Sequence, residues 1–87
     1  MENIKQLLAS NQVEKAIELI KRQLDNQPDA DELWYLLGKS HYKLGHTREA
    51  LNSYLRAIEL NPDSPAKGAY DMAIRVLDFY NKDMYNQ

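Results

Sequence analysis

Few side chains in this sequence have the type and spacing that catalysis or metal binding needs. His41 and His46 are the only histidines, and there is no cysteine. The two histidines are five residues apart and separated by Gly45, so their imidazoles are badly placed to share a metal ion. Without cysteine, a disulfide or a thiolate metal site is excluded. Ser40 and Ser53 are isolated, and no phosphate-binding loop or close carboxylate pair accompanies them. The sequence therefore predicts neither an enzyme nor a bound cofactor or metal.

The other side chains with binding chemistry are tyrosines and lysines at helical spacing. Tyr35, Lys39 and Tyr42 recur at intervals of four and three residues, so they share one face of a predicted helix. Such a strip could bind a peptide that carries apolar side chains and a carboxylate. The alternative is that the tyrosines are packing residues and the lysines ordinary solvated charges.

The element that carries this strip belongs to a pattern with a 34-residue period. Ala16 precedes Ala50 by 34 positions, and the same interval separates Ile20 from Tyr54 and Pro28 from Pro62. A unit of this length is a helix–turn–helix pair, which cannot bury its apolar face alone and stacks on copies of itself. The pattern therefore favours a function that lies in a surface.

The first helix of the best-defined unit spans residues 31–44. Trp34, Leu37 and His41 lie along one face of it. Gly38 lies on the same face, and because a glycine inside a helix costs about 1 kcal/mol against alanine, it predicts a closely packed neighbour. Gly45 is expected to end the helix in the left-handed conformation that glycine adopts freely.

The second helix of the unit spans residues 47–60. Thr47 is its predicted N-cap, and Asn61-Pro62 ends it, because proline disfavours a helical residue before it. Small residues stand where the two helices cross, at Ala50 and Ala57. The whole apolar stripe consists of Ala50, Leu51, Tyr54, Ala57 and Ile58.

Residues 31–64 resemble a tetratricopeptide repeat (TPR) over its full length. His41 stands where the family usually has tyrosine, and Thr47 departs at a site that is often aromatic. The resemblance implies an all-α fold, an α-solenoid of antiparallel helix pairs with about five helices in right-handed superhelical stacking. The family pattern is met at eight of nine positions, by Trp34, Leu37, Gly38, Gly45, Ala50, Tyr54, Ala57 and Pro62.

The flanking segments read as incomplete copies within one domain. Residues 1–30 form a truncated, degenerate helix pair, in which Gln23 replaces the small residue found at Ala57. Residues 65–82 are predicted to form a C-terminal capping helix, and residues 83–87 a tail. A one-residue shift of the period gives the capping helix an apolar packing face of Ala69, Met72, Ala73, Val76 and Phe79. The same shift leaves Tyr70, Ile74 and Leu77 on another face.

The resemblance also implies a binding surface, because the first helices of TPR pairs line a concave groove that binds peptides or helices. The truncated first helix adds Lys5 and Leu8 to this surface, and Glu32 lies on the same face. Chaperone-binding members use paired asparagines and further basic residues at these positions, and their absence here disfavours a chaperone clamp. Carried over to this chain, the peptide-binding residues are Tyr35, Leu36, Lys39, Tyr42, Lys43, Tyr70 and Ile74.

Self-association is the alternative function. A chain with fewer than three repeats has little core, and a homodimer through the last helix would supply the missing neighbour. A third arrangement has residues 81–87 folding back into the groove of their own or a partner chain. The residues expected in a homodimer interface are Tyr70, Ile74, Leu77, Tyr80, Met84 and Tyr85.

Composition narrows the class of partner. The chain has 87 residues and a formal net charge of −2, with basic residues scattered among acidic ones. No basic stripe for nucleic acid, no membrane span and no signal-peptide pattern is visible. We therefore expect a cytoplasmic protein whose partner is a protein or peptide. Met1, the truncated first copy and the aperiodic tail favour a natural small protein over a fragment of a longer array.

Overall fold

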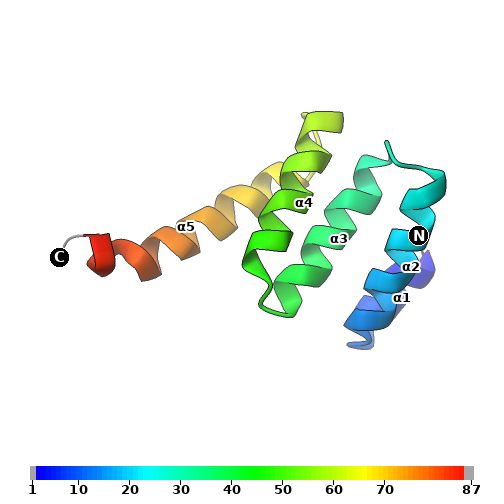
Figure 1. Cartoon of the computed structure of the whole chain (residues 1–87), viewed down its shortest axis with the longest axis horizontal. Helices are drawn as coiled ribbons and strands as arrows, with labels where there is room; N and C mark the ends of the chain where they lie inside the picture. Colours follow the sequence, from blue (N-terminus) through cyan, green and yellow to red (C-terminus); the bar gives the residue numbers. More distant parts are fainter. Residues whose placement is uncertain (1, 86–87) are drawn as a thin grey trace.

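The computed structural model describes the backbone of residues 2–85 and the side chains of residues 2–80. Within residues 2–85 the chain forms five helices and no strand (Figure 1). The main contacts of each helix are with the next helix along the chain. The predicted all-α stack of helix pairs is confirmed. The helices are α1 (Glu2–Ala9), α2 (Val13–Asn26), α3 (Asp31–Lys43), α4 (Thr47–Leu60) and α5 (Ala66–Tyr85).

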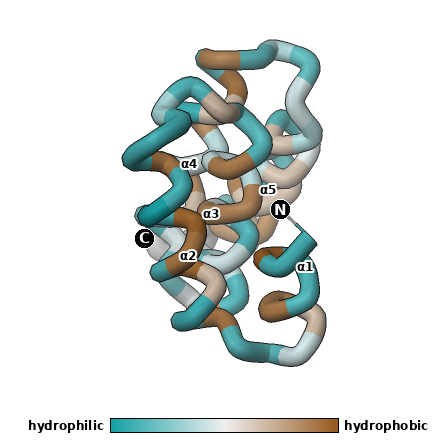
Figure 2. The backbone as a smooth tube through the Cα atoms, turned by 90° about the vertical axis from the view of Figure 1, so that its right-hand side faces the viewer, coloured by the Kyte–Doolittle hydropathy of each residue, from teal (hydrophilic) through white to brown (hydrophobic). Residues whose placement is uncertain are grey.

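Two clusters of buried side chains hold the stack together. The first joins α1 and α2 to α3, and the second joins α4 to the start of α5. Trp34 packs against both clusters, and its indole Nε1 donates a hydrogen bond of 2.9 Å to the carbonyl oxygen of Pro28. In Figure 2 apolar and hydrophilic segments alternate along each helix, as amphipathic helices require.

The turns inside the first two pairs use the same backbone conformation. Gly45 has a φ of +78°, and Asn11, 34 residues earlier, has a φ of 63°. Asparagine is one of the few residues other than glycine that tolerate this left-handed region. The degenerate first pair therefore keeps the turn geometry of the complete repeat.

Helix α4 starts differently from the prediction but ends where the sequence predicts. His46 occupies the N-cap position without a side-chain capping bond, so the prediction of Thr47 as N-cap is wrong by one residue. At the other end α4 stops at Leu60, as Asn61-Pro62 predicts. The amide of Asn61 donates to Asp31 Oδ2 at 3.1 Å, which ties the end of α4 to the start of α3.

The last helix is longer than predicted. Ser64 caps its start, with its Oγ accepting a 3.1 Å hydrogen bond from the backbone N–H of Ala66. The helix continues to Tyr85 and carries residues 81–85 away from α3 (Figure 1). The helix therefore extends beyond the predicted end at residue 82, and residues 81–85 do not fold back into the groove of their own chain. Residues 86–87 lie outside the described part, and a tail in the groove of a partner chain stays a prediction.

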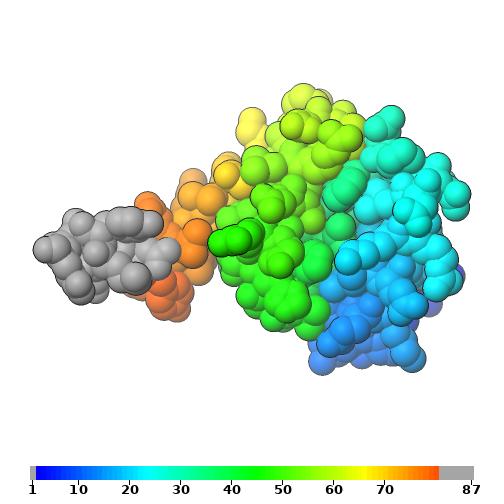
Figure 3. Space-filling model, in the orientation of Figure 1, coloured from blue at the N-terminus to red at the C-terminus, as the bar shows by residue number. Residues whose placement is uncertain are grey.

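The packing face of α5 also differs from the prediction. Ala66 and Ala73 are buried, and Ala69 and Tyr70 pack against the α4 cluster. The predicted packing residues Met72, Val76 and Phe79 are exposed. The reason is that α3 packs between α2 and α4, whereas α5 packs on α4 alone among the main helix contacts of the described chain. Beyond Ala73 the helix leaves the body of the protein, and Figure 3 shows the protruding arm.

A candidate peptide-binding groove

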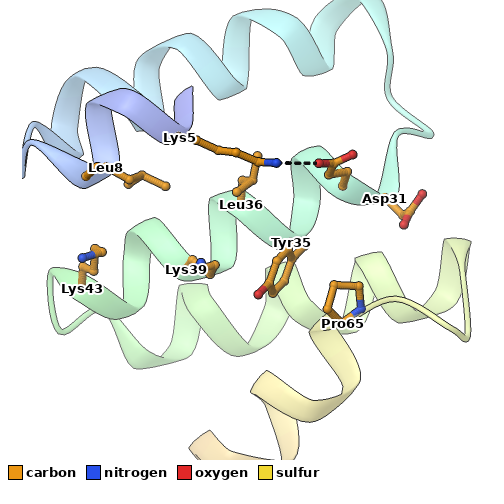
Figure 4. Close-up of a pocket in the computed structure, with 10 residues that line it drawn as sticks. Lys5, Leu8, Asp31, Tyr35, Leu36, Lys39, Lys43 and Pro65 are labelled. Atoms are coloured by element: carbon orange, nitrogen blue, oxygen red, sulfur yellow. Dashed lines mark ion pairs between the residues drawn. The ribbon is translucent and has the colours of Figure 1, made fainter. Parts of the chain in front are cut away.

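A cavity of about 610 Å³ opens between α1, α3 and the start of α5. Figure 4 shows Tyr35, Lys39 and Lys43 of α3 along one side of it, with Lys5 and Leu8 of α1 opposite. The α3 residues that face the cavity recur at intervals of three and four, so they lie on one face of that helix. The lining consists of Lys5, Leu8, Ala9, Asp31, Glu32, Tyr35, Leu36, Lys39, Lys43 and Pro65.

A second cavity of about 250 Å³ lies on the α5 side of the same row of residues. Tyr35, Lys39 and Lys43 line both cavities, so the two hollows adjoin along α3. The result is one continuous concave surface formed by α1, α3 and α5. The additional residues of the second cavity are Tyr42, Tyr54, Ala69, Met72 and Ala73.

The position of Tyr35 is set from beneath by Gly38 and Tyr54. A Cβ at Gly38 would lie 2.5 Å from two ring atoms of Tyr54, so only glycine admits the ring at this crossing of α3 and α4. The Tyr54 ring in turn lies 6.2 Å from the Tyr35 ring, centroid to centroid. The most closely packed point of the repeat therefore supports the tyrosine at the centre of the groove.

Burial also keeps the hydroxyl of Tyr54 protonated. Tyr54 is 3% exposed. Burial, with smaller contributions from Tyr35 and Tyr42, raises the pKa of its hydroxyl to about 12. At neutral pH Tyr54 is therefore uncharged, and lysine and carboxylate side chains supply the charge at the rim of the groove.

The charges along the groove are unequally paired. Lys5 Nζ lies 3.6 Å from Glu32 Oε1, with both side chains half exposed. Lys39 Nζ lies 5.4 Å from the centroid of the Tyr35 ring, a cation–π distance. The ion pairs within the described residues include neither Lys39 nor Lys43. The groove thus has an acidic end at the start of α3 and a cationic end about two and three turns farther along the helix.

Comparison with known proteins identifies the family. The family model described as tetratricopeptide repeat matches residues 31–64. This chain is a tetratricopeptide-repeat protein. It is also similar to the solution NMR structure of protein BF1650 from Bacteroides fragilis, with a TM-score of 0.87 and 47% sequence identity over 99% of this chain and 88% of that chain. At that identity and coverage the two belong to one family. No curated protein matches.

The TPR groove contains most of the residues that the sequence singled out. Leu36 is buried and lines the first cavity, and Tyr42 lines the second. Both cavities are lined by Tyr35, Lys39 and Lys43. Tyr70 and Ile74 line neither cavity and are half buried instead, because α5 is rotated relative to the expected register. Sequence reasoning missed Met72 and Pro65 as lining residues, although Pro65, just before the last helix, marks where that helix enters the groove.

The predicted self-association residues of this TPR protein are divided between two environments. Leu77 and Tyr80 are exposed, whereas Tyr70 and Ile74 are half buried within the chain. The side chains of Met84 and Tyr85 lie outside the described part. Met72, Val76 and Phe79 are exposed as well, so the uncovered face of α5 is turned toward these three residues rather than toward Tyr70 and Ile74.

His41, Ser40 and Ser53 are placed by burial and by hydrogen bonds within their own helices. His41 Nδ1 is buried without a hydrogen-bond partner among the described residues, and desolvation, with Lys21 nearby, lowers the pKa of the imidazole. The Ser40 and Ser53 hydroxyls donate to backbone carbonyls four residues earlier, at 2.7 and 2.9 Å. The described residues contain no group of three or more potential metal ligands.

None of the helices within the described residues has the length and apolar character needed to cross a membrane.

Proposed function

We propose that this protein is a non-enzymatic interaction module that binds an extended segment of a partner protein in the groove formed by α1, α3 and α5. The observation that carries the proposal is the continuity of the two cavities along Tyr35, Lys39 and Lys43. A TPR is a protein-interaction repeat, and its first helices are the elements that line this groove. The cavity volume suits a few side chains of a peptide.

The lining indicates the chemistry of the bound segment. Leu8, Leu36 and the Tyr35 ring offer an apolar surface that suits an aliphatic or aromatic side chain. Lys39 and Lys43 follow one turn apart, and neither joins an ion pair within the described residues. A carboxylate on the peptide, from a side chain or a C-terminus, would pair with these two cations.

Charge also selects the orientation of the segment. Asp31 and Glu32 make the opposite end of the groove acidic, and Lys5 balances one of these carboxylates. A peptide with its carboxylate at Lys39 keeps that group away from Asp31 and Glu32, whereas the reversed peptide brings it against them.

The test is binding of an array of peptides that combine apolar and acidic residues, followed by titration calorimetry of the best binder. We expect Tyr35→Ala and Lys39→Glu each to weaken binding at least about 10-fold, since each removes a central contact. Lys15→Glu is the matched control, because Lys15 is exposed on α2 outside both cavities. Equal affinities for the Lys39 and Lys15 variants would remove the groove from consideration.

A further inference from the structure

The second half of α5 carries a row of large apolar side chains that nothing in the described chain covers. Met72, Val76, Phe79 and Tyr80 are 60%, 38%, 74% and 74% exposed. They recur at intervals of four, three and one residues, so they share one face of the helix. Single exposed apolar residues are ordinary, but four on one helix face mark an interaction surface.

This exposed row continues an interface that already exists inside the molecule. Ala69 and Ala73, on the edge of the same face, pack toward α4 and line the groove. The apolar face of α5 is therefore covered at its start and uncovered beyond Ala73, where the helix leaves the body (Figures 1 and 3). What is uncovered is the kind of surface that another helix packs on.

Gly68 is the second sign that a helix is missing. It is the third residue of α5, one turn before Met72. A Cβ at Gly68 would meet nothing within 4 Å, whereas a Cβ at Gly38 would collide with the Tyr54 ring. Packing explains Gly38, and the single chain offers no packing that explains Gly68.

The two ends of the exposed face are complementary in shape. Gly68 and Ala69 make one end small, and Phe79 and Tyr80 make the other end bulky. The ends are 11 residues apart, about 16 Å along the helix axis. When two copies of this face are laid antiparallel, the bulky end of each covers the small end of the other, and Met72 of one meets Val76 of the other. The two-fold axis then crosses the pair at the level of residue 74 along the helix.

We infer that this protein forms a homodimer through an antiparallel pair of α5 helices, in which the Phe79 and Tyr80 rings of each copy pack over Gly68 and Ala69 of the other. The occupant of the exposed face is a second copy because the face is complementary to itself. An interface of this isologous kind closes after two chains. The opposite side of α5 is polar and stays in solvent, through Lys67, Asp71 and Asp78. The inference does not rest on the groove ligand, but the dimer covers Ala69 and Met72 of the second cavity, so dimerisation and peptide binding compete there.

Sedimentation equilibrium across a concentration series tests the dimer. The wild-type chain is expected to change from monomer to dimer and to stop there. Phe79→Ser is expected to raise the half-dimer concentration at least about 10-fold. Leu55→Ser is the matched control, because Leu55 is 44% exposed on α4, away from this face, and its half-dimer concentration should stay within about two-fold. A chain that remains monomeric at several hundred micromolar, or assembles beyond the dimer, overturns the inference.

Gly68→Ala separates the interface from the fold, because its two effects have opposite signs. In the monomer the new methyl group enters open space, so the melting temperature at low concentration should rise. In the dimer the same methyl group meets the Phe79 ring of the second copy, so the half-dimer concentration should also rise, by at least about 10-fold. A dimer that tolerates both Gly68→Ala and Phe79→Ser has its interface elsewhere, which overturns the inference.

Single cysteines test whether two α5 helices meet near residue 75, since the chain has no cysteine of its own. Near the two-fold axis, Arg75→Cys places two thiols about 3 Å apart along the axis, whereas Lys67→Cys places them about 20 Å apart. Mild oxidation should therefore cross-link the first variant and leave the second uncross-linked. Equal cross-linking of both variants indicates random collision rather than this pair, and cross-linking of neither indicates a different interface. Either result overturns the proposed arrangement.

Discussion

Helices α3 and α5 hold equivalent places in successive repeats, yet they differ in how completely they are covered. α3 packs between α2 and α4 and buries five residues. α5 packs on α4 through its first two turns and exposes Met72, Phe79 and Tyr80 beyond them. The difference shows that amphipathic helices in a stack need a neighbour on each side, and that the last helix of a short array exposes a full interface when it lacks one.

The two glycines inside these helices express the same difference. Gly38 is buried at a helix crossing that Tyr54 fills, and Gly68 is exposed with open space around its Cα. A glycine therefore predicts close packing in this fold, but it does not say whether the packed neighbour belongs to the same chain.

The largest expected effect comes from substituting the buried glycine. Gly38→Ala places a methyl group 2.5 Å from the Tyr54 ring and 3.2 Å from the Ala50 carbonyl oxygen. Because the ring is enclosed, the variant should lose about 2–3 kcal/mol of unfolding free energy, as overpacked cores do. Urea denaturation measures the loss. Gly68→Ala, measured at a concentration where the chain is monomeric, is the control and should gain up to about 1 kcal/mol. Equal effects of the two substitutions would contradict the comparison.

A smaller effect is expected from ionising the ring that fills this crossing. Because burial raises the pKa of Tyr54 from 10 to about 12, the folded protein holds this proton more tightly than the unfolded chain. Its contribution to stability is complete below pH 10 and is lost as the pH rises toward 12. Chemical denaturation at pH 9.5 and 12 should show a loss on the order of 1–2 kcal/mol beyond that of Tyr54→Phe. If stability falls equally with pH in the wild type and in Tyr54→Phe, the Tyr54 hydroxyl is not buried with a raised pKa.

The smallest effect concerns the start of α5. Ser64 accepts a hydrogen bond from the Ala66 N–H, whereas α3 begins after Ala30 without a side-chain cap. Ser64→Ala should therefore cost about 1 kcal/mol and lower the helical circular dichroism of α5 before the rest of the stack melts. Ser10→Ala is the control and should stay within about 0.5 kcal/mol, because the exposed Ser10 hydroxyl donates to the Gln6 carbonyl at a helix C-terminus and caps no helix start. If Ser64→Ala lowers stability but all helices still melt in one cooperative transition, α5 does not unfold separately.

Sequence reasoning is most informative where both neighbours of a helix are encoded in the chain. The period that joins Ala16 to Ala50 and Pro28 to Pro62 predicts four helices and their turns, because each apolar position has a defined partner one repeat away. Asn11 shows the strength of this constraint, since it keeps the left-handed turn of Gly45 without being glycine.

The rest could not be derived from periodicity because α5 has no following helix in the described chain. Its apolar residues cover a wide arc, and the pattern alone cannot say which part meets α4. The one-residue shift correctly buries Ala73 but also places Met72 and Phe79 inside, where the structure exposes them. The groove residues on α3 follow from the repeat, whereas those on α5 depend on the angle at which that helix departs.

Trp34 has a practical consequence. It is the single tryptophan of the chain, and it packs against both buried clusters while its Nε1 donates to Pro28. Its fluorescence is therefore a built-in reporter of whether the first helix pair is docked on the second. If the truncated pair detaches first on heating, tryptophan emission will shift to longer wavelength before ellipticity falls. Coincident curves will instead show that the incomplete repeat and the complete one melt as a single cooperative unit.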